Sequence, residues 1–242
     1  MRYLLTFSYD GTLFYGYQKQ KNKRSVQEEI EKVLSKINNS KTIISASGRT
    51  DAGVHAINQK AHFDSSKTFD LDRLKHSMNK MLPGDIFIKK IESVSDTFHA
   101  RFDAVKKEYE YMINVGEYNP LDRNYIYQYN WNLDVDKMRD AIKYFIGTHN
   151  FKSVTKTITE EKDYVRTIYD ASVEFDNNII TINFVGNGFM RYMVRNMVGL
   201  LIAVGESKIE ASDIPLILDK ENRIFAKKTA PSEGLYLKNV YY

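Results

Sequence analysis

The chain has 242 residues, with 35 basic and 31 acidic side chains and no cysteine. The absence of cysteine excludes disulfides, cysteine-based zinc sites and thiol nucleophiles, which fits a protein of the reducing cytosol. The net charge of +4 is compatible with a nucleic-acid partner but is too small to imply one. The longest apolar stretch, Met197 to Gly205, is far shorter than the roughly 20 residues of a membrane-spanning helix. The first residues also lack the apolar core of a signal peptide, so we expect a cytoplasmic protein without a membrane partner.

The spacing of apolar residues predicts the secondary structure along the chain. In order, it predicts a strand over 2–9, a helix from Ser25, strands over 41–46 and 59–63, a helix over 71–82, strands over 86–94 and 107–115, a helix from Asp134, a hairpin of 166–175 with 179–185 around Asn177-Asn178, a helix over 189–204, a short helix after Ser212 and a strand over 235–242. In many of the predicted strands apolar and polar residues alternate, and no regular βαβ spacing occurs. The pattern therefore favours an α+β fold with a mainly antiparallel sheet over a doubly wound parallel one.

One short polar segment is basic, with Lys19, Lys21, Lys23 and Arg24 close together. The chain also contains 17 tyrosines and 13 phenylalanines. Basic side chains can neutralise phosphates, and aromatic faces can stack on unpaired bases. A solvated loop beside an aromatic-rich core gives the same composition, so both interpretations stay open here.

The segment from Gly48 to His55 places two glycines, a cation, an anion and an imidazole between two predicted strands. Such a junction can hold functional groups rigidly while exposing them. A tight turn in which Arg49 pairs with Asp51 is the structural alternative. A metal site would need three or four ligands, and beyond Asp51, His55 and His62 the candidates are scattered, so no metal is expected. The chain has no Gly-x-Ser-x-Gly elbow, phosphate-binding loop or dinucleotide fingerprint.

Two further segments combine cations with aromatic or apolar residues. Around Arg101, the run Phe98 to Phe102 has the composition of a base-stacking surface. In the apolar helix, Arg191 and Arg195 are four residues apart and share a face. An arginine in that setting either pairs with a carboxylate or extends its charged end to solvent.

Together, five segments in order over nearly the whole chain resemble the signatures of the tRNA pseudouridine synthase A family. They are Tyr9–Gln18 with the helix start Ser25-Val26-Gln27, Gly48–Ala56, Phe98–Arg101 with Tyr109 and Tyr111, Gly188–Gly199, and Thr229–Leu235. One departure is Tyr17, where the family usually has tryptophan. This exchange of one aromatic ring for another affects only local packing.

The resemblance implies a catalytic role for Asp51, as a nucleophile toward ribose or base, or as a base that removes a ribose proton. It implies that Arg195 forms an ion pair with Asp51, and that Tyr109 stacks on the target base and can assist proton removal from C5. The substrate-binding residues expected with them are Arg49, Tyr109, His55, Arg101, Lys19, Lys21 and Lys23. The reaction needs no redox equivalent, so no cofactor is expected.

The resemblance also implies a homodimer that binds tRNA and modifies uridines 38, 39 and 40 of the anticodon stem-loop. It implies two similar α+β halves, 1–105 with the catalytic loop and 106–242, which share a mainly antiparallel sheet flanked by helices and enclose a catalytic cleft. Two alternatives stay open: the same chemistry on another RNA, such as ribosomal RNA, and a catalytically silent RNA-binding module.

Overall fold

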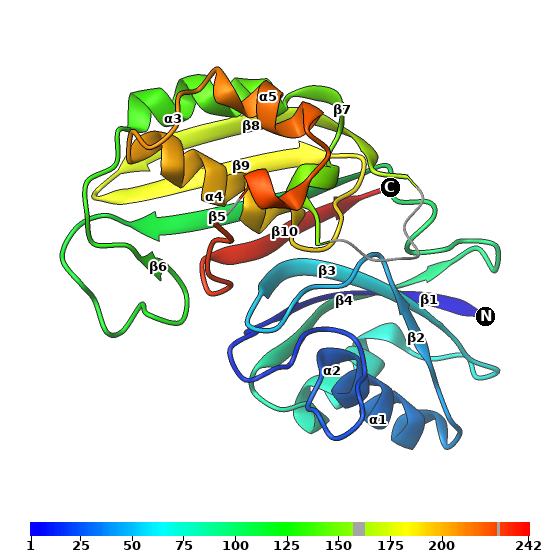
Figure 1. Cartoon of the computed structure of the whole chain (residues 1–242). Coiled ribbons are helices and arrows are strands. Elements are labelled where there is room, and N and C mark those ends of the chain that lie inside the picture. The colour runs from blue at the N-terminus through cyan, green and yellow to red at the C-terminus, as the bar shows by residue number, and fades with distance from the viewer. Residues whose placement is uncertain (157–162, 227) are drawn as a thin grey trace. The chain divides into compact units, whose positions relative to one another are not determined.

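The computed structural model describes residues 1–156, 163–226 and 228–242. By packing, they form two compact units, Met1–Val105 with Tyr236–Tyr242 and Lys106–Leu235. Each unit combines one sheet with helices, which confirms the predicted α+β class (Figure 1). The predicted second half extended to residue 242, whereas in the structure the last strand packs with the first unit.

The sheet of the first unit is built around its first strand. β1 (Arg2–Tyr9) is antiparallel to both of its neighbours, β4 (Ile86–Val94) and β3 (His55–Asp64). The short β2 (Ile44–Ala46) is antiparallel to β3, and β10 (Leu235–Tyr241) is parallel to it. The four residues of β1 that were predicted to share one face, Tyr3, Leu5, Phe7 and Tyr9, are all buried. Helices α1 (Val26–Asn38) and α2 (Leu71–Met81) cover one face of this sheet (Figure 1).

Short polar side chains cap the start of one helix of the second unit and of both α1 and α2 in the first. The Ser25 hydroxyl accepts the Glu28 N–H, as the sequence predicted for the start of α1. Asp70 caps α2 in the same way. Asp134 caps α3 (Val135–Ile142), again at the predicted residue. These caps satisfy backbone donors that have no partner within the helix, and so fix where each helix begins.

The second unit has an antiparallel sheet in the order β5-β9-β8-β7, with β6 parallel to β5. The strands are β5 (Lys106–Asn114), β6 (Tyr127–Gln128), β7 (Gly147–Asn150), β8 (Val165–Asp176) and β9 (Ile179–Gly186). The predicted hairpin is confirmed, because Asn177 and Asn178 have φ of 48° and 65°, the left-handed pair of a two-residue turn.

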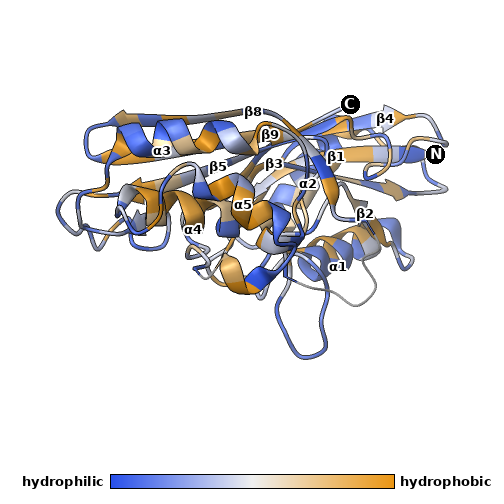
Figure 2. Ribbon diagram, turned by 45° about the horizontal axis from the view of Figure 1, so that its top comes forward, coloured by the Kyte–Doolittle hydropathy of each residue, from blue (hydrophilic) through white to orange (hydrophobic). Residues whose placement is uncertain are grey.

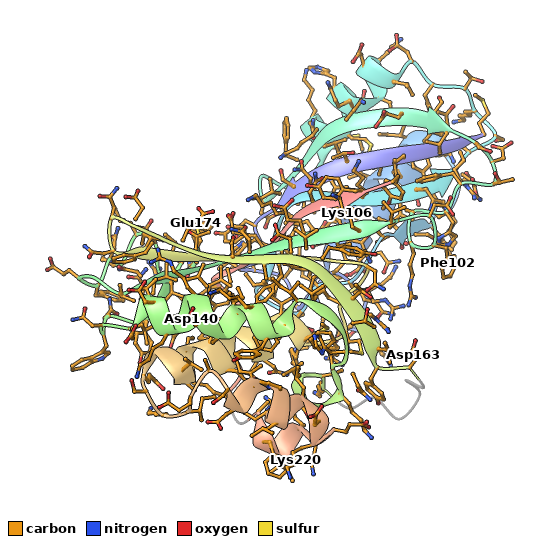
Figure 3. All side chains as sticks on the ribbon, turned by 90° about the horizontal axis from the view of Figure 1, so that it is seen from above. Phe102, Lys106, Asp140, Asp163, Glu174 and Lys220 are labelled. Atoms are coloured by element: carbon orange, nitrogen blue, oxygen red, sulfur yellow. The ribbon has the colours of Figure 1, made fainter. Side chains whose placement is uncertain are left out.

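Three helices cover one face of the second sheet. They are α3, α4 (Met193–Gly205) and α5 (Asp213–Asp219). Asp140 of α3 and Lys220 after α5 lie on the same side of β8, opposite Glu174 (Figure 3). α4 is apolar along most of its length (Figure 2) and nearly all of its residues are buried. None of the helices in the described part of the chain is long and apolar enough to cross a membrane.

The predicted start of α4 at Phe189 is wrong by four residues. The helix begins at Met193 because Tyr192 has a φ of 64°, a left-handed conformation that ends any right-handed run. The strand predicted from residue 41 begins at Ile44, because Thr42 instead binds the end of α1 through its N–H to the Ser35 hydroxyl.

Candidate active site

The loop that carries Asp51 connects β2 to β3 and contains a tight turn. The Val54 N–H donates to the Asp51 carbonyl over 3.2 Å, and Gly53, the third residue of the turn, has a φ of +77°. This is the arrangement of a type II turn, which requires glycine at that position. Asp51 is half-buried and Arg49 is exposed. The turn therefore presents the carboxylate from a fixed backbone.

The N-terminal segment that follows β1 packs against this loop through its backbone. The Tyr17 N–H donates to the Thr50 carbonyl over 3.1 Å, and the Gly53 N–H donates to the Phe14 carbonyl over 3.4 Å. Gly11 lies so close to the turn that a Cβ there would be 2.1 Å from the Val54 carbonyl oxygen. Two sequence motifs far apart in the chain thus form one structural unit around Asp51.

Buried side chains of β1 and β3 hold the loop from inside the sheet. The Tyr9 hydroxyl is 2.8 Å from the Thr50 hydroxyl, next to Asp51. Gln59 accepts from the Ser47 hydroxyl over 2.7 Å and donates to the Gly48 carbonyl over 3.2 Å. Burial raises the pKa of Tyr9 to about 12, against the opposing effect of its hydrogen bonds, so the phenol is neutral and can donate. Sequence reasoning missed Tyr9, Thr50 and Gln59 as supporting residues; the only signal was a glutamine amid apolar strand positions.

His55 lies at the start of β3 and is buried, with 2% of its surface exposed. Its Nδ1 accepts the Gly11 N–H over 3.0 Å, and its ring stacks on Tyr236 at 4.7 Å. Nδ1 also lies 3.3 Å from an oxygen of the Asp10 carboxylate. His55 thus braces the loop, and its predicted contact with substrate stays a prediction.

The other two predicted catalytic residues belong to the second unit. Tyr109 on β5 is 8% exposed, and the edge of its ring meets Phe189 at 5.0 Å. Arg195 on α4 donates from Nε to the Ala230 carbonyl over 2.7 Å, and its guanidinium lies over the Tyr192 ring at 5.0 Å. The predicted C-terminal signature, which contains Ala230, therefore holds one nitrogen of the guanidinium. The predicted ion pair of Arg195 with Asp51 stays a prediction.

The predicted RNA-contacting segments of the first unit pair cations with aromatic rings. Lys23 lies 4.0 Å over the half-exposed Tyr15 ring, while Lys19 is 3.8 Å from Glu28. Lys21 is exposed.

Arg101 lies 5.8 Å over the exposed Phe102 ring, which itself packs on His99 at 4.3 Å. Burial lowers the pKa of His62, whose neutral Nδ1 accepts the Ala100 N–H and so fixes this segment. The structure therefore gives the segment around Arg101 one exposed ring, Phe102, of the kind that a base-stacking surface needs.

A cavity of about 630 Å³ lies in the second unit between α4, α5 and the segment around Phe225, and none of the predicted site residues lines it. Its charged wall contains Glu206, whose carboxylate binds the Tyr129 hydroxyl, Lys208 and Lys228. Burial opposes ionisation of Glu206, but these three partners outweigh it and lower the pKa of the carboxyl. Among the described residues, no group of three His, Asp or Glu side chains could hold a metal ion.

A family model described as tRNA pseudouridine synthase matches residues 5–103 and 141–242. The chain belongs to the tRNA pseudouridine synthase family, whose members are isomerases that act on tRNA. Within that family, it is 46% identical over 239 residues to tRNA pseudouridine synthase A 1 of Bacillus cereus, covering 98% of this chain and 97% of that one.

Two further relatives are named tRNA pseudouridine synthase A. The chain is 43% identical over 245 residues to the protein of Streptococcus agalactiae, covering 100% of this chain and 95% of that one. It is 45% identical over 239 residues to the protein of a Geobacillus species, covering 98% of this chain and 96% of that one. A chain of a solved Cbf5-Nop10-Gar1 complex covers 85% of this chain and 55% of its own length at 14% identity, and its TM-score of 0.37 is too low to carry an argument.

Proposed function

We propose that this chain isomerises uridine to pseudouridine at positions 38, 39 and 40 of the tRNA anticodon stem-loop. The observation that carries the proposal is the geometry of the Asp51 loop. Its turn, its backbone bonds to the N-terminal segment and the Tyr9–Thr50 bond hold one half-buried carboxylate in place. A reaction that needs neither redox chemistry nor external energy depends on such positioning of a nucleophile or base.

The reaction breaks the bond between ribose C1′ and N1 of uracil, turns the base, and joins C1′ to C5. The proton on C5 is then lost and N1 gains one, so atoms balance without a co-reactant. Asp51 acts as nucleophile or as base. Tyr109 stacks on the turned base and assists the removal of the C5 proton, while Arg195 pairs with Asp51 and favours its ionised form.

Further contacts with the substrate are assigned to residues other than Asp51, Tyr109 and Arg195. Arg49 is exposed beside Asp51, in a position to hold the nucleotides around an extruded base. His55, Arg101 and the lysines of the basic segment are the further proposed contacts. We propose a cytoplasmic homodimer whose catalytic cleft lies between the two halves of each chain.

The test measures tritium release from tRNA labelled at uridine C5, for the wild type, Asp51→Asn and the control Asp72→Asn. Asp72 is a fully exposed carboxylate on α2. Release by the wild type and the control, but not by Asp51→Asn, is the expected result. Release by all three would move catalysis to another group. Binding of tRNA by the wild type without release would favour a silent RNA-binding module, and release only from ribosomal RNA would favour the other substrate.

The basic segment has its own test. Replacing Lys19, Lys21 and Lys23 by glutamine should weaken tRNA binding and lower the slope of log affinity against log salt by about 2, at roughly 0.7 per lost contact to single-stranded RNA. The control replaces three exposed lysines of the same unit, at 32, 36 and 41, and should leave the slope unchanged. Equal slopes for both triple variants would show an ordinary solvated loop.

A further inference from the structure

The sheet of the first unit is covered by that unit's helices on one face only, in the part of the chain that the structure describes (Figure 1). We call the other face of β1, β3 and β4, opposite α1 and α2, the open face. Leu5 and Phe7 are fully buried, and Thr6 between them lies on the open face, because side chains alternate along a strand. Thr6 pairs directly with Lys60 of β3 and with Lys90 of β4. Paired residues share a face, so a row of lysine, threonine and lysine crosses three strands of the open face.

A third cation, Lys89, lies across the same face. It occupies the position in β4 where the pairing with β1 shifts register. Its ammonium reaches past β1 and donates to the Asn58 side-chain oxygen of β3 over 3.2 Å. In the described chain, the three lysines have one ion pair between them, that of Lys90 with Glu92 over 2.6 Å. Two of the three cations therefore have no carboxylate at ion-pair distance.

Lys60 differs from an ordinary surface lysine because it is half-buried. Its ammonium lies 5.4 Å over the Tyr242 ring. Burial lowers the pKa of Lys60, the attraction of Glu92 opposes this effect, and the repulsion of Lys90 adds to it. A cation held away from water without an ion-pair partner costs free energy, and a bound anion would offset that cost.

Aromatic surface beside these cations matches RNA better than a small anion. Phe87 is 56% exposed and pairs with Ser8, so its ring lies on the open face. Tyr242 is 41% exposed, and its hydroxyl donates to the carbonyl of Ala100, the residue before Arg101. The open face is thus continuous with the segment around Arg101, which is itself a proposed RNA contact. Cations interleaved with exposed rings are typical of surfaces that bind nucleic acid.

The open face also lies within reach of an RNA whose target uridine is at Asp51. β3 leaves the Asp51 loop at His55, and Lys60 follows on the same strand. At about 3.4 Å per residue, the two lie on the order of 17 Å apart. A few base pairs span that distance, so a phosphate near the target nucleotide can meet the row.

A second copy of this chain fits the open face less well than RNA does. In a two-fold interface the same patch meets itself, so these lysines would face the lysines of the other copy. Interface centres are also depleted in lysine and rich in apolar side chains. The centre of the open face is instead Thr6 between Lys60 and Lys90. The phosphates of RNA complement such a row without apolar surface.

We propose that the open face binds backbone phosphates of the RNA substrate through Lys60, Lys89 and Lys90, outside the loop that carries the target uridine. This inference rests on the proposed function, which supplies the RNA. The three lysines position the RNA and take no part in bond breaking. None of them belongs to a motif that the sequence analysis singled out, so the pairing of the strands is what brings them together.

The experiment compares two triple variants of the full-length protein that lose the same charge. In one, glutamine replaces Lys60, Lys89 and Lys90. In the control, it replaces the exposed lysines at 32, 36 and 41, which lie on or just after α1, the helix on the opposite face. Binding of tRNA is measured over a salt series in the Asp51→Asn background. KM and kcat for tritium release are measured in the active background, and urea unfolding checks that both variants are folded.

Loss of three phosphate contacts should lower the salt slope by about 2, at roughly 0.7 per contact. Between roughly 50 and 200 mM salt, the affinity should then fall on the order of 16-fold less than that of the wild type. We expect KM to rise while kcat stays, since a contact made equally in ground and transition states affects binding alone. The control should match the wild type in all three quantities.

Two further variants make the test independent of the half-buried Lys60. The double variant Lys89→Gln with Lys90→Gln changes exposed residues only and should lower the slope by about 1.4. Glu92→Gln should act in the opposite direction and tighten binding by up to about fivefold, because RNA no longer has to displace the exposed ion pair with Lys90.

Slopes of the triple and double variants equal to that of the control would refute the proposal. If sedimentation then showed that the triple variant had also lost self-association, the open face would belong to a second copy. Tritium release by the wild type with unchanged slopes would refute the RNA surface and leave the proposed function standing. Lowered slopes without any tritium release would refute the proposed function and leave the RNA surface standing.

Discussion

The hydroxyl of Tyr17 offers a sharp test of the packing behind the Asp51 loop. Tyr17 is 2% exposed, and its hydroxyl is a buried polar atom without a hydrogen-bond partner in the described structure. The ring centroid of Tyr9 is 6.5 Å away, and that residue's hydroxyl is bound to Thr50. The two tyrosines therefore share an environment and differ in whether the hydroxyl is satisfied. The same substitution at each position isolates that difference.

The expected effects have opposite signs. A buried polar group without a partner costs about 1–3 kcal/mol, so Tyr17→Phe should raise the free energy of unfolding by about 1 kcal/mol or more. Tyr9→Phe removes a buried hydrogen bond and should lower it by about 1 kcal/mol. The two variants should thus differ by about 2 kcal/mol, although each loses one oxygen atom.

Urea unfolding monitored by circular dichroism measures this difference. The slope m should stay unchanged in both variants, so that the shift in midpoint reports stability alone. A midpoint for Tyr17→Phe as low as that for Tyr9→Phe would refute the reasoning. It would mean that the Tyr17 hydroxyl has a hydrogen-bonding partner, such as a bound water.

Two further predictions concern the same region. The pKa of the Tyr9 phenol is near 10 in the unfolded chain and about 12 in the folded one, so between these pH values the unfolded chain holds fewer protons. The free energy of unfolding should therefore fall as pH rises through this range. Tyr9→Phe should flatten this fall in a pH series of urea midpoints. Gly11→Ala would place a Cβ 2.1 Å from the Val54 carbonyl oxygen and should cost several-fold in tritium release together with stability, whereas Gly84→Ala, with nothing within 4 Å, should change neither.

Local signals in the sequence predicted much of the fold. Alternation identified β1, the Ser25 cap located α1, and the asparagine pair located the turn between β8 and β9. The strand β3 was predicted to begin at Gln59, whereas it begins at His55. The prediction missed its first half because that half buries polar side chains that bind the loop. Such polar positions break the apolar pattern from which a strand is recognised.

For the candidate site, the motif Gly48–Ala56 located the Asp51 loop but could not show which residues hold it in place. The bonds of Tyr9 to Thr50 and of Gly11 to His55 join residues more than 40 positions apart. Sequence spacing carries no signal for such pairs. The two arginines were predicted to share a helix face, but only Arg195 lies on α4, because the left-handed Tyr192 separates Arg191 from the helix. Both lie over the Tyr192 ring, and its left-handed backbone had no signal in the sequence either.

The parallel pairing of β10 with β3 bears on how the protein is made. Tyr236 pairs with His55 and stacks on its ring, although most of the chain lies between them in sequence. A ribosome therefore releases β1, β3 and β4 long before the strand that completes their sheet. Until then the edge of β3 beside the Asp51 loop is open, and open strand edges can pair with other chains. Contacts that close such long loops also form slowly. The His55 end of the Asp51 loop thus gains this packing partner only after most of these residues have been synthesised, and a chaperone that shields this edge would matter most before then.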